Sequence, residues 1–399
     1  MTTTDVRSVL EDAMGDGDGI LELDPALVAR DWLPPGRRLG LAEDEYDVGD
    51  RGFICERWLA STTHADNEVG PPDEGISHIR LADGRRLSLE AAVRAAPTDI
   101  LGTAYAATHD GLGRLAKIYD FAARIPYHIH PPSRYAELVG RKSKDEAYYL
   151  PPGVDLGTHP ETFLGTHPSL ADGSGRRIFL QYLRSWDSDE ILKHAPAYLQ
   201  VAEEGFFVPS GVLHAPGTAL TIELQEDSDT LSMFQALNAG ALISKDLLYK
   251  DVDRAERDVR GEDAVLDWVD WPANADPYFY ENRHLAPRVF HDADGVTEAW
   301  ILYGSTKFSG KRLIIAPGAR YVARERGVFN LLAWRGRGTI GGTAVLGGQV
   351  GADELLVVHD RAVQPLEYVN TGDDDLVIIK FFGPDINPDA PHVTEMGHA

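Results

Sequence analysis

Short apolar runs separated by turn-forming residues make up most of the chain and predict a mainly β protein. Glycine, proline, asparagine and aspartate interrupt these runs from residue 34 to about residue 86, and again from residue 289 to residue 382. Runs of this kind are typical of strands in a sandwich or a barrel. We therefore expect two packed β-barrel or jelly-roll units with helical additions.

The middle of the chain continues the strand pattern. Apolar runs recur at residues 112–120, 177–183, 205–209 and 219–224. Their lengths and their bounding glycines and prolines favour strands over helices. We expect each of these four segments to be a strand.

Two segments have helical spacing instead. Residues 5–14 place their apolar side chains on one helical face. Residues 88–96 do the same, with Ser88 as the expected N-cap and Pro97 after the last turn. We predict a short amphipathic helix at each place.

Near residue 245 the sequence becomes rich in charged residues that are compatible with helices, and at residue 289 it returns to a strand-like pattern. This shift predicts an N-terminal region over residues 1–245, a helical connector over residues 246–288, and a second β unit over residues 289–399.

Charge limits the classes of partner. The chain has 399 residues, of which 63 are acidic and 38 basic, and its formal net charge is -25. Such a charge repels phosphate backbones and anionic membrane surfaces, so we expect neither a nucleic-acid partner nor a membrane partner. An anionic small substrate requires a local basic pocket that works against this field.

Targeting signals and disulfides are not expected. The first residues lack a basic region followed by an apolar one, and no apolar run approaches the roughly 18 residues of a membrane span. The single cysteine, Cys55, excludes an internal disulfide and is expected to be a small buried hydrophobe. These features predict a cytoplasmic protein, and the sequence leaves its oligomeric state open.

The clearest chemistry lies in the segment Pro126-Tyr127-His128-Ile129-His130-Pro131. Side chains alternate between the two faces of an extended strand, so His128 and His130 point the same way. Two imidazoles on one face can bind one metal ion together.

A carboxylate and a third imidazole are available to complete the group. Glu146 follows Lys142-Ser143-Lys144-Asp145, and His214 follows the turn Pro209-Ser210-Gly211. Three imidazoles and one carboxylate hold a divalent ion with positions left for water or substrate, as a catalytic site requires. Imidazole suits zinc, manganese, iron or nickel. The alternative is that these histidines are unrelated polar residues at strand ends.

Two further histidines lie in a repeated tetrapeptide, Gly-Thr-His-Pro, at residues 157–160 and 165–168. Proline after each histidine breaks regular structure, so we expect His159 and His167 to lie in a solvated loop.

Several short stretches together resemble the class I mannose-6-phosphate isomerase family, which comprises metal-dependent enzymes of the cupin superfamily. The similarity covers most of residues 36–245 and, more weakly, the C-terminal half. The matching stretches are Gly36-Arg37-Arg38-Leu39, Glu56-Arg57-Trp58, Leu101-Gly102, Leu115-Ala116-Lys117-Ile118, the His-x-His strand, Lys144-Asp145-Glu146, Val208-Pro209-Ser210-Gly211-Val212-Leu213-His214, Glu223 and Ser228-Asp229.

The resemblance implies a role for each matching residue. It implies two cupin units, with metal ligands at His128, His130, Glu146 and His214 and zinc as the expected ion; manganese and iron are alternatives. It also implies catalytic roles for Lys144 and Glu223 and a substrate-binding role for Asp229. In such a site the metal polarises adjacent oxygens, a base moves a proton between C1 and C2, and a cation stabilises the enediolate.

Two departures from the family pattern bear on the substrate and the metal. The family usually has glutamine where this chain has His128, and three histidines with one glutamate also occur in other cupin isomerases and in cupin oxygenases. The family has an arginine a few residues after Ser228-Asp229, whereas this chain has none until Arg254. Because the arginine fork suits phosphate oxygens, its absence argues against a phosphorylated substrate.

We therefore predict an aldose-ketose isomerase of carbohydrate metabolism that acts on a sugar or a sugar phosphate. The alternatives are an iron cupin oxygenase and a non-catalytic sugar-binding regulatory cupin. The second unit has no His-x-His pair in its strand at residues 319–324, so we expect no metal there.

Overall fold

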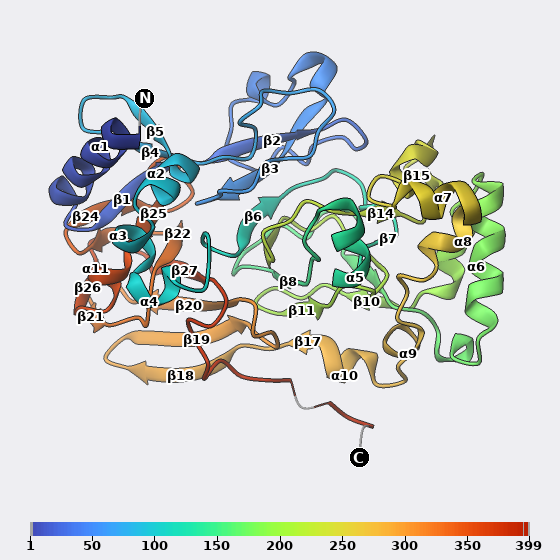
Figure 1. Cartoon of the computed structure of the whole chain (residues 1–399). Helices are drawn as coiled ribbons and strands as arrows, with labels where there is room; N and C mark the ends of the chain where they lie inside the picture. Colours follow the sequence, from blue (N-terminus) through green and yellow to red (C-terminus); the bar gives the residue numbers. More distant parts are fainter. Residues whose placement is uncertain (1–2, 394, 398–399) are drawn as a thin grey trace.

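The computed structural model describes residues 3–393 and 395–397 (Figure 1). The chain is mainly β, as predicted, and its strands form antiparallel sheets that belong to two cupin-type units with added helices. The seven-stranded sheet of the first unit consists, in spatial order, of β17 (His284–Leu285), β11 (Gly205–Val208), β8 (Glu146–Tyr149), β13 (Thr221–Gln225), β6 (Leu115–Tyr119), β3 (Phe53–Leu59) and β2 (Ala26–Arg30). Its five-stranded sheet consists of β10 (Ala197–Leu199), β9 (Glu161–Leu164), β12 (His214–Ala215), β7 (His128–Ile129) and β14 (Ser232–Met233).

The second unit also has two sheets. The nine-stranded sheet consists of β18 (Arg288–Ala293), β19 (Val296–Leu302), β20 (Ser309–Ile315), β27 (Leu376–Phe382), β22 (Phe329–Arg335), β25 (Glu354–Val357), β1 (Ile20–Asp24), β4 (His78–Arg80) and β5 (Arg86–Ser88). The four-stranded sheet consists of β21 (Arg320–Ala323), β26 (Leu366–Asn370), β23 (Arg337–Ile340) and β24 (Thr343–Leu346). A separate hairpin pairs β15 (Leu237–Asn238) with β16 (Ala241–Leu242).

Helices surround these sheets. The α-helices are α1 (Thr3–Asp16), α2 (Leu89–Ala95), α3 (Pro97–Leu101), α4 (Thr103–Ala106), α5 (Ser133–Ala136), α6 (Ser174–Ser185), α7 (Arg254–Arg260), α8 (Glu262–Val265), α9 (Trp271–Asn274), α10 (Phe279–Arg283) and α11 (His359–Ala362). The 3-10 helices are η1 (Glu43–Glu45), η2 (Gly49–Arg51), η3 (Glu137–Val139), η4 (Pro168–Leu170), η5 (Glu190–His194) and η6 (Lys245–Leu248). Within residues 3–393 and 395–397, every helix is too short or too polar to span a bilayer.

Both helices predicted near the start of the chain are confirmed. The first is α1, and the second is α2, where the Ser88 hydroxyl accepts a hydrogen bond from the Ala91 backbone N–H at 3.3 Å. The prediction of a buried Cys55 is also confirmed.

The predicted strand at residues 177–183 is wrong, because this segment forms the greater part of α6. Gly175, Phe179 and Leu183 are its buried residues, and their spacing of four places them on one helical face. The apolar side chains next to Phe179 in the sequence gave the appearance of a strand. Figure 1 shows α6 beside α8 at the end of the first unit.

The N-terminal segment contributes to the second unit. Strand β1 pairs with β25, with Ile20 opposite Val357, and its other edge pairs with β4. Val6 and Leu10 of α1 belong to the same buried cluster as Leu355 and Val357 of β25, although these elements lie at opposite ends of the sequence. The predicted division of the chain at residues 245 and 288 stays a prediction. The contacts show in addition that β1 is part of the nine-stranded sheet of the second unit.

The two units share a hydrophobic core. Ile222 of the seven-stranded sheet belongs to the same buried cluster as Leu302 and Ile379 of the nine-stranded sheet. A buried ion pair also joins the units: Arg57 of β3 lies 2.7 Å from the carboxylate of Asp353. Packing of the second unit therefore supports the sheet that carries Glu146 and Glu223.

Candidate metal centre and its cavities

Strand β7 positions the two histidines of the His-x-His segment. His128 and His130 face the interior between the two sheets of the first unit, whereas Ile129 packs into the core beside α6 and α8. The strand ends at Ile129, so His130 lies just after it and Pro131 follows. The predicted alternation of faces is therefore what the structure shows.

The third histidine comes from the neighbouring strand. His214 of β12 lies directly opposite His128 of β7 in the sheet. The imidazole rings of these two residues have centroids 4.0 Å apart, and His130 lies 5.0 Å from His214. One nitrogen from each of the three rings lies within 4.8 Å of the others, so these residues can share one ion.

Backbone carbonyls orient all three rings. The Nδ1 atom of His128 lies 2.7 Å from the Pro126 carbonyl oxygen, and that of His130 lies 2.7 Å from the Thr230 carbonyl. His214 is held in the same way, 2.9 Å from the Val212 carbonyl. A carbonyl only accepts, so Nδ1 carries the proton in each ring and Nε2 presents its lone pair to the interior. Metal-binding histidines in proteins are commonly oriented by such contacts.

Glu146 of β8 faces these rings from the opposite sheet. Its Oε2 atom lies 3.0 Å from Nε2 of His130, and its Oε1 atom lies 3.0 Å from Nε2 of His214. The Tyr148 hydroxyl donates a hydrogen bond to Oε1. The structure thus brings together all four residues that the sequence predicted as ligands.

The protonation states agree with a metal-binding group. Burial and the neighbouring His214 and His130 lower the pKa of His128 well below its ordinary value, and burial and Lys144 lower the pKa of His130 to about 3. Burial alone raises the pKa of Glu146, but Lys144 and the imidazoles hold it well below its ordinary value. Neutral imidazoles beside an ionised carboxylate are what a divalent cation requires.

The surroundings of the Nε2 atoms of His130 and His214 show whether a metal ion fits between these residues. Both are fully buried and have no hydrogen-bond partner among the described residues. Each faces a carboxylate oxygen at 3.0 Å, so two lone-pair-bearing atoms point at one another. Since this arrangement is repulsive without a positive charge between the atoms, the donor set fits a divalent ion.

Lys144 and Glu223 lie beside this group. Lys144 Nζ lies 2.9 Å from Oε2 of Glu146 and 3.2 Å from Oε1 of Glu223. Burial, and then the nearby Glu146, raises the pKa of Glu223 above its ordinary value. A carboxyl group is better suited to accept and return a proton when its pKa lies closer to the pH at which the enzyme works.

Two residues that the sequence analysis left without a role complete this cluster. Lys117 lies opposite Glu223 in the β6–β13 ladder, and its Nζ atom is 3.3 Å from Glu223 and 3.3 Å from Glu56. Both Lys117 and Glu56 lie in stretches that carry the family resemblance. Their position on adjacent strands was the signal that could have identified them.

Asp229 is buried and pairs with an arginine that no motif indicated. Arg30 of β2 lies 3.0 Å from the Asp229 carboxylate and 2.7 Å from Glu56. The two sequence positions are 199 residues apart. Met233, near the place where the family has an arginine, is buried beside His128 and provides no cation.

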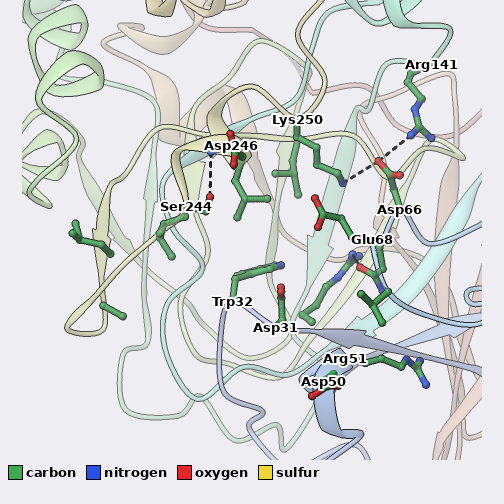
Figure 2. A pocket seen from close by; sticks show the side chains of 18 residues that line it. Asp31, Trp32, Asp50, Arg51, Asp66, Glu68, Arg141, Ser244, Asp246 and Lys250 are labelled. Carbon is green, nitrogen blue, oxygen red and sulfur yellow. Dashed lines mark hydrogen bonds and ion pairs between the residues drawn. The ribbon is translucent and has the colours of Figure 1, made fainter.

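The cluster opens through two adjoining cavities. The inner one, of about 40 Å³, is lined by the predicted site residues other than His214. The outer one, of about 770 Å³, is large enough for a monosaccharide (Figure 2). Arg30, Trp32 and Leu231 line both cavities, so the outer one leads to the inner one.

The loop histidines lie apart from this group. His159 is half exposed and lies 3.4 Å from Glu161, and His167 is exposed. The prediction that they lie in a loop is confirmed, since neither belongs to a helix or strand.

Comparisons with known proteins place this geometry in context. No protein-family model matches the chain. The chain is 26% identical over 231 residues to a mannose-6-phosphate isomerase of Streptococcus mutans; the match covers 57% of this chain and 63% of that protein.

Solved structures share the fold over nearly the whole chain. The mannose 6-phosphate isomerase of Bacillus subtilis is 17% identical, with a TM-score of 0.63 and coverage of 91% of this chain and 99% of that one. A variant of phosphomannose isomerase from Salmonella typhimurium is 12% identical, with a TM-score of 0.62 and coverage of 92% and 99%. A mannose 6-phosphate isomerase bound with zinc and yttrium is 12% identical, with a TM-score of 0.61 and coverage of 92% and 100%. The chain thus resembles the class I mannose-6-phosphate isomerase family of the cupin superfamily in both sequence and fold, as its motifs indicated.

Proposed function

We propose that this protein is a metal-dependent aldose-ketose isomerase. The observation that carries the proposal is the buried group in which Nε2 of His130 and Nε2 of His214 each lie 3.0 Å from Glu146, with no hydrogen-bond partner among the described residues, and His128 lies beside them. A second carboxylate, Glu223, lies beside this group at the end of a cavity large enough for a sugar. The relatives reported above are isomerases, which favours this function over an iron oxygenase or a regulatory cupin.

We assign the metal to His128, His130, Glu146 and His214, with zinc as the expected ion and manganese or iron as alternatives. A solved structure of similar fold carries zinc, which supports this choice. A bound divalent ion supplies polarisation of the adjacent carbonyl and hydroxyl oxygens of the sugar.

The chain's own residues supply the proton transfer and the orientation. Glu223 takes a proton from one of the carbons C1 and C2 and returns it to the other. Lys144 and Lys117 lie within 3.3 Å of Glu223 and offer positive charge to the enediolate that forms on the sugar. Burial of all three side chains excludes water and strengthens these interactions.

The test combines metal analysis with turnover. The protein purified with one equivalent of a divalent metal should interconvert an aldose and its ketose, with solvent deuterium entering C2 of the aldose and C1 of the ketose. Free and phosphorylated mannose, free fructose and lyxose form the substrate panel. Oxygen consumption by an iron-loaded sample without isomerisation would favour the oxygenase, and sugar binding without any turnover would favour the regulatory protein. A cytoplasmic location stays a prediction.

A further inference from the structure

Every basic side chain that lines the inner cavity is held by carboxylates. Arg30 is buried between Glu56 and Asp229. Lys117 and Lys144 share Glu223, and each has a second acidic partner. Each of these cations therefore already has a carboxylate partner, and none is free to pair with a phosphate group.

The basic side chains of the outer cavity are held in the same way. Asp66 lies between Arg141 and Lys250, at 2.9 Å from the first and 3.3 Å from the second, as Figure 2 shows. The remaining cation, Arg51, lies 2.7 Å from Glu74. Asp66 is thus the nearest carboxylate to two of the four cations that line this cavity; Arg141 also lies 4.0 Å from Asp251, and Lys250 also donates to the Asp229 carbonyl at 3.2 Å.

The carboxylates outnumber the cations in both cavities. Five carboxylates and four cations line the outer cavity, and four carboxylates and three cations line the inner one; Arg30 belongs to both. Together the two cavities have nine carboxylates and six cations, so a divalent metal ion in the inner cavity leaves one negative charge in excess overall, and that excess lies in the outer cavity. The net charge of the whole chain, -25, adds to the same field.

A phosphate group and a sugar ring make opposite demands on such a cavity. A phosphate dianion binds through unpaired arginine, lysine or clustered backbone N–H groups, because its charge must be matched when water is removed. Sugar hydroxyls are neutral donors, and carboxylate oxygens accept from them. Trp32, where the two cavities meet, adds an apolar ring surface.

We propose that, within the isomerase function proposed above, the site takes an unphosphorylated aldose, and that Asp66 excludes the phosphorylated sugar by holding Arg141 and Lys250. Asp66 is then a specificity-determining residue that lies outside the metal group. Because it is 31% exposed on the wall of the outer cavity, it meets the substrate before the inner cluster does.

Binding of two polyols to the metal-loaded full chain tests the substrate class without any need for turnover. Mannitol mimics an open-chain sugar, and mannitol 1-phosphate differs from it only by the phosphate. Calorimetry should give a dissociation constant for mannitol at least tenfold lower than for the phosphorylated polyol. Tighter binding of the phosphorylated polyol would overturn the proposal. If no sugar is isomerised but the tenfold preference holds, the isomerase function fails and the preference for an unphosphorylated ligand stands.

The variant Asp66→Asn tests the proposed residue. The amide keeps the shape of the side chain but removes the nearest carboxylate of Arg141 and Lys250, so the preference for mannitol over mannitol 1-phosphate should fall at least tenfold. Asp246→Asn is the matched control, because Asp246 lines the same cavity, and no ion pair joins it to another described residue. Equal effects of the two variants would show that only net charge matters and would remove Asp66 from the proposal.

A double variant distinguishes the effect of the Lys250 charge from a structural change caused by Asp66→Asn. Lys250→Gln in the Asp66→Asn background removes one of the two cations and should restore at least half of the lost preference on a logarithmic scale. A double variant that binds the phosphorylated polyol as well as Asp66→Asn does would contradict the role given to Lys250 and Arg141.

Discussion

Nε2 of His214 lies 3.0 Å from Oε1 of Glu146, and this Nε2 atom has no hydrogen-bond partner among the described residues. Nδ1 of His214 donates a hydrogen bond to the Val212 carbonyl, and Lys144 and the neighbouring imidazoles hold the pKa of Glu146 well below its ordinary value. Two buried lone-pair-bearing atoms at this distance need a cation between them. The metal assignment depends on this contact and on its counterpart between His130 and Glu146.

Replacing His214 with alanine should therefore remove the metal. Loss of one imidazole leaves an incomplete donor set, and elemental analysis after dialysis should find much less than one metal per chain. His159→Ala is the control, because His159 is a half-exposed loop residue and its loss should leave the stoichiometry at one. A His214→Ala protein that binds one metal with unchanged affinity would contradict the ligand assignment.

Glu223→Gln should keep the metal and lose turnover. The amide cannot accept the proton from the sugar, so the rate should fall by about a hundredfold or more, the usual contribution of a general base. Steady-state rates and metal content, measured on the same sample, check this. Glu226→Gln is the matched control, because Glu226 pairs with Lys307 outside the cavities and its loss should leave the rate within a few-fold. Full activity of Glu223→Gln would remove Glu223 from the mechanism.

The ion pair between Arg57 and Asp353 should contribute strongly to stability, since it is buried and joins the two units. Asp353→Asn leaves a buried guanidinium with a weakened partner and should lower the free energy of unfolding by about 3 kcal/mol. The exposed pair Arg254–Asp258 is the control. Asp258→Asn should change the free energy of unfolding by less than about 0.5 kcal/mol. Urea denaturation measures both, and equal small effects would show that the buried pair does not hold the units together.

Glu354 should make the stability depend on pH. Burial raises the pKa of this carboxyl to about 7, even though Arg57 lies 3.2 Å away. A pKa that is higher in the folded than in the unfolded state favours the folded state below the unfolded value, and this contribution is lost as the pH rises through the folded value. Between pH 4.5 and pH 7 the free energy of unfolding should therefore fall, relative to Glu354→Gln, by up to about 3 kcal/mol. A constant difference between wild type and variant across this range would contradict the assignment.

The metal group was predictable because strand alternation and a family pattern both apply within short segments. His128 and His130 are separated by one residue, and Glu146 and His214 lie in stretches that resemble the family. The partners of these residues were less accessible to sequence reasoning. Arg30 reaches Asp229 across 199 positions, so only the folded sheet order could reveal the pair.

The helix α6 shows a different limit. Its segment contains enough adjacent apolar residues to imitate a strand, and the buried spacing from Gly175 to Phe179 to Leu183 decides for a helix only once the core is known. The place of β1 in the fold could not be predicted from its local sequence either, because it pairs with β25, more than three hundred positions away. Contacts between distant segments determined both outcomes.

Solvent-deuterium exchange during sugar turnover tests the central claim most directly. The metal-loaded protein is incubated with D-mannose, and separately with mannose 6-phosphate, in D2O and followed by NMR. The account predicts formation of the ketose with deuterium at C1 and exchange of the hydrogen at C2 of the aldose, both faster with the free sugar. Removal of the metal by a chelator should abolish ketose formation and deuterium incorporation. A fully metal-loaded protein that exchanges no proton at C2 of either sugar would contradict it.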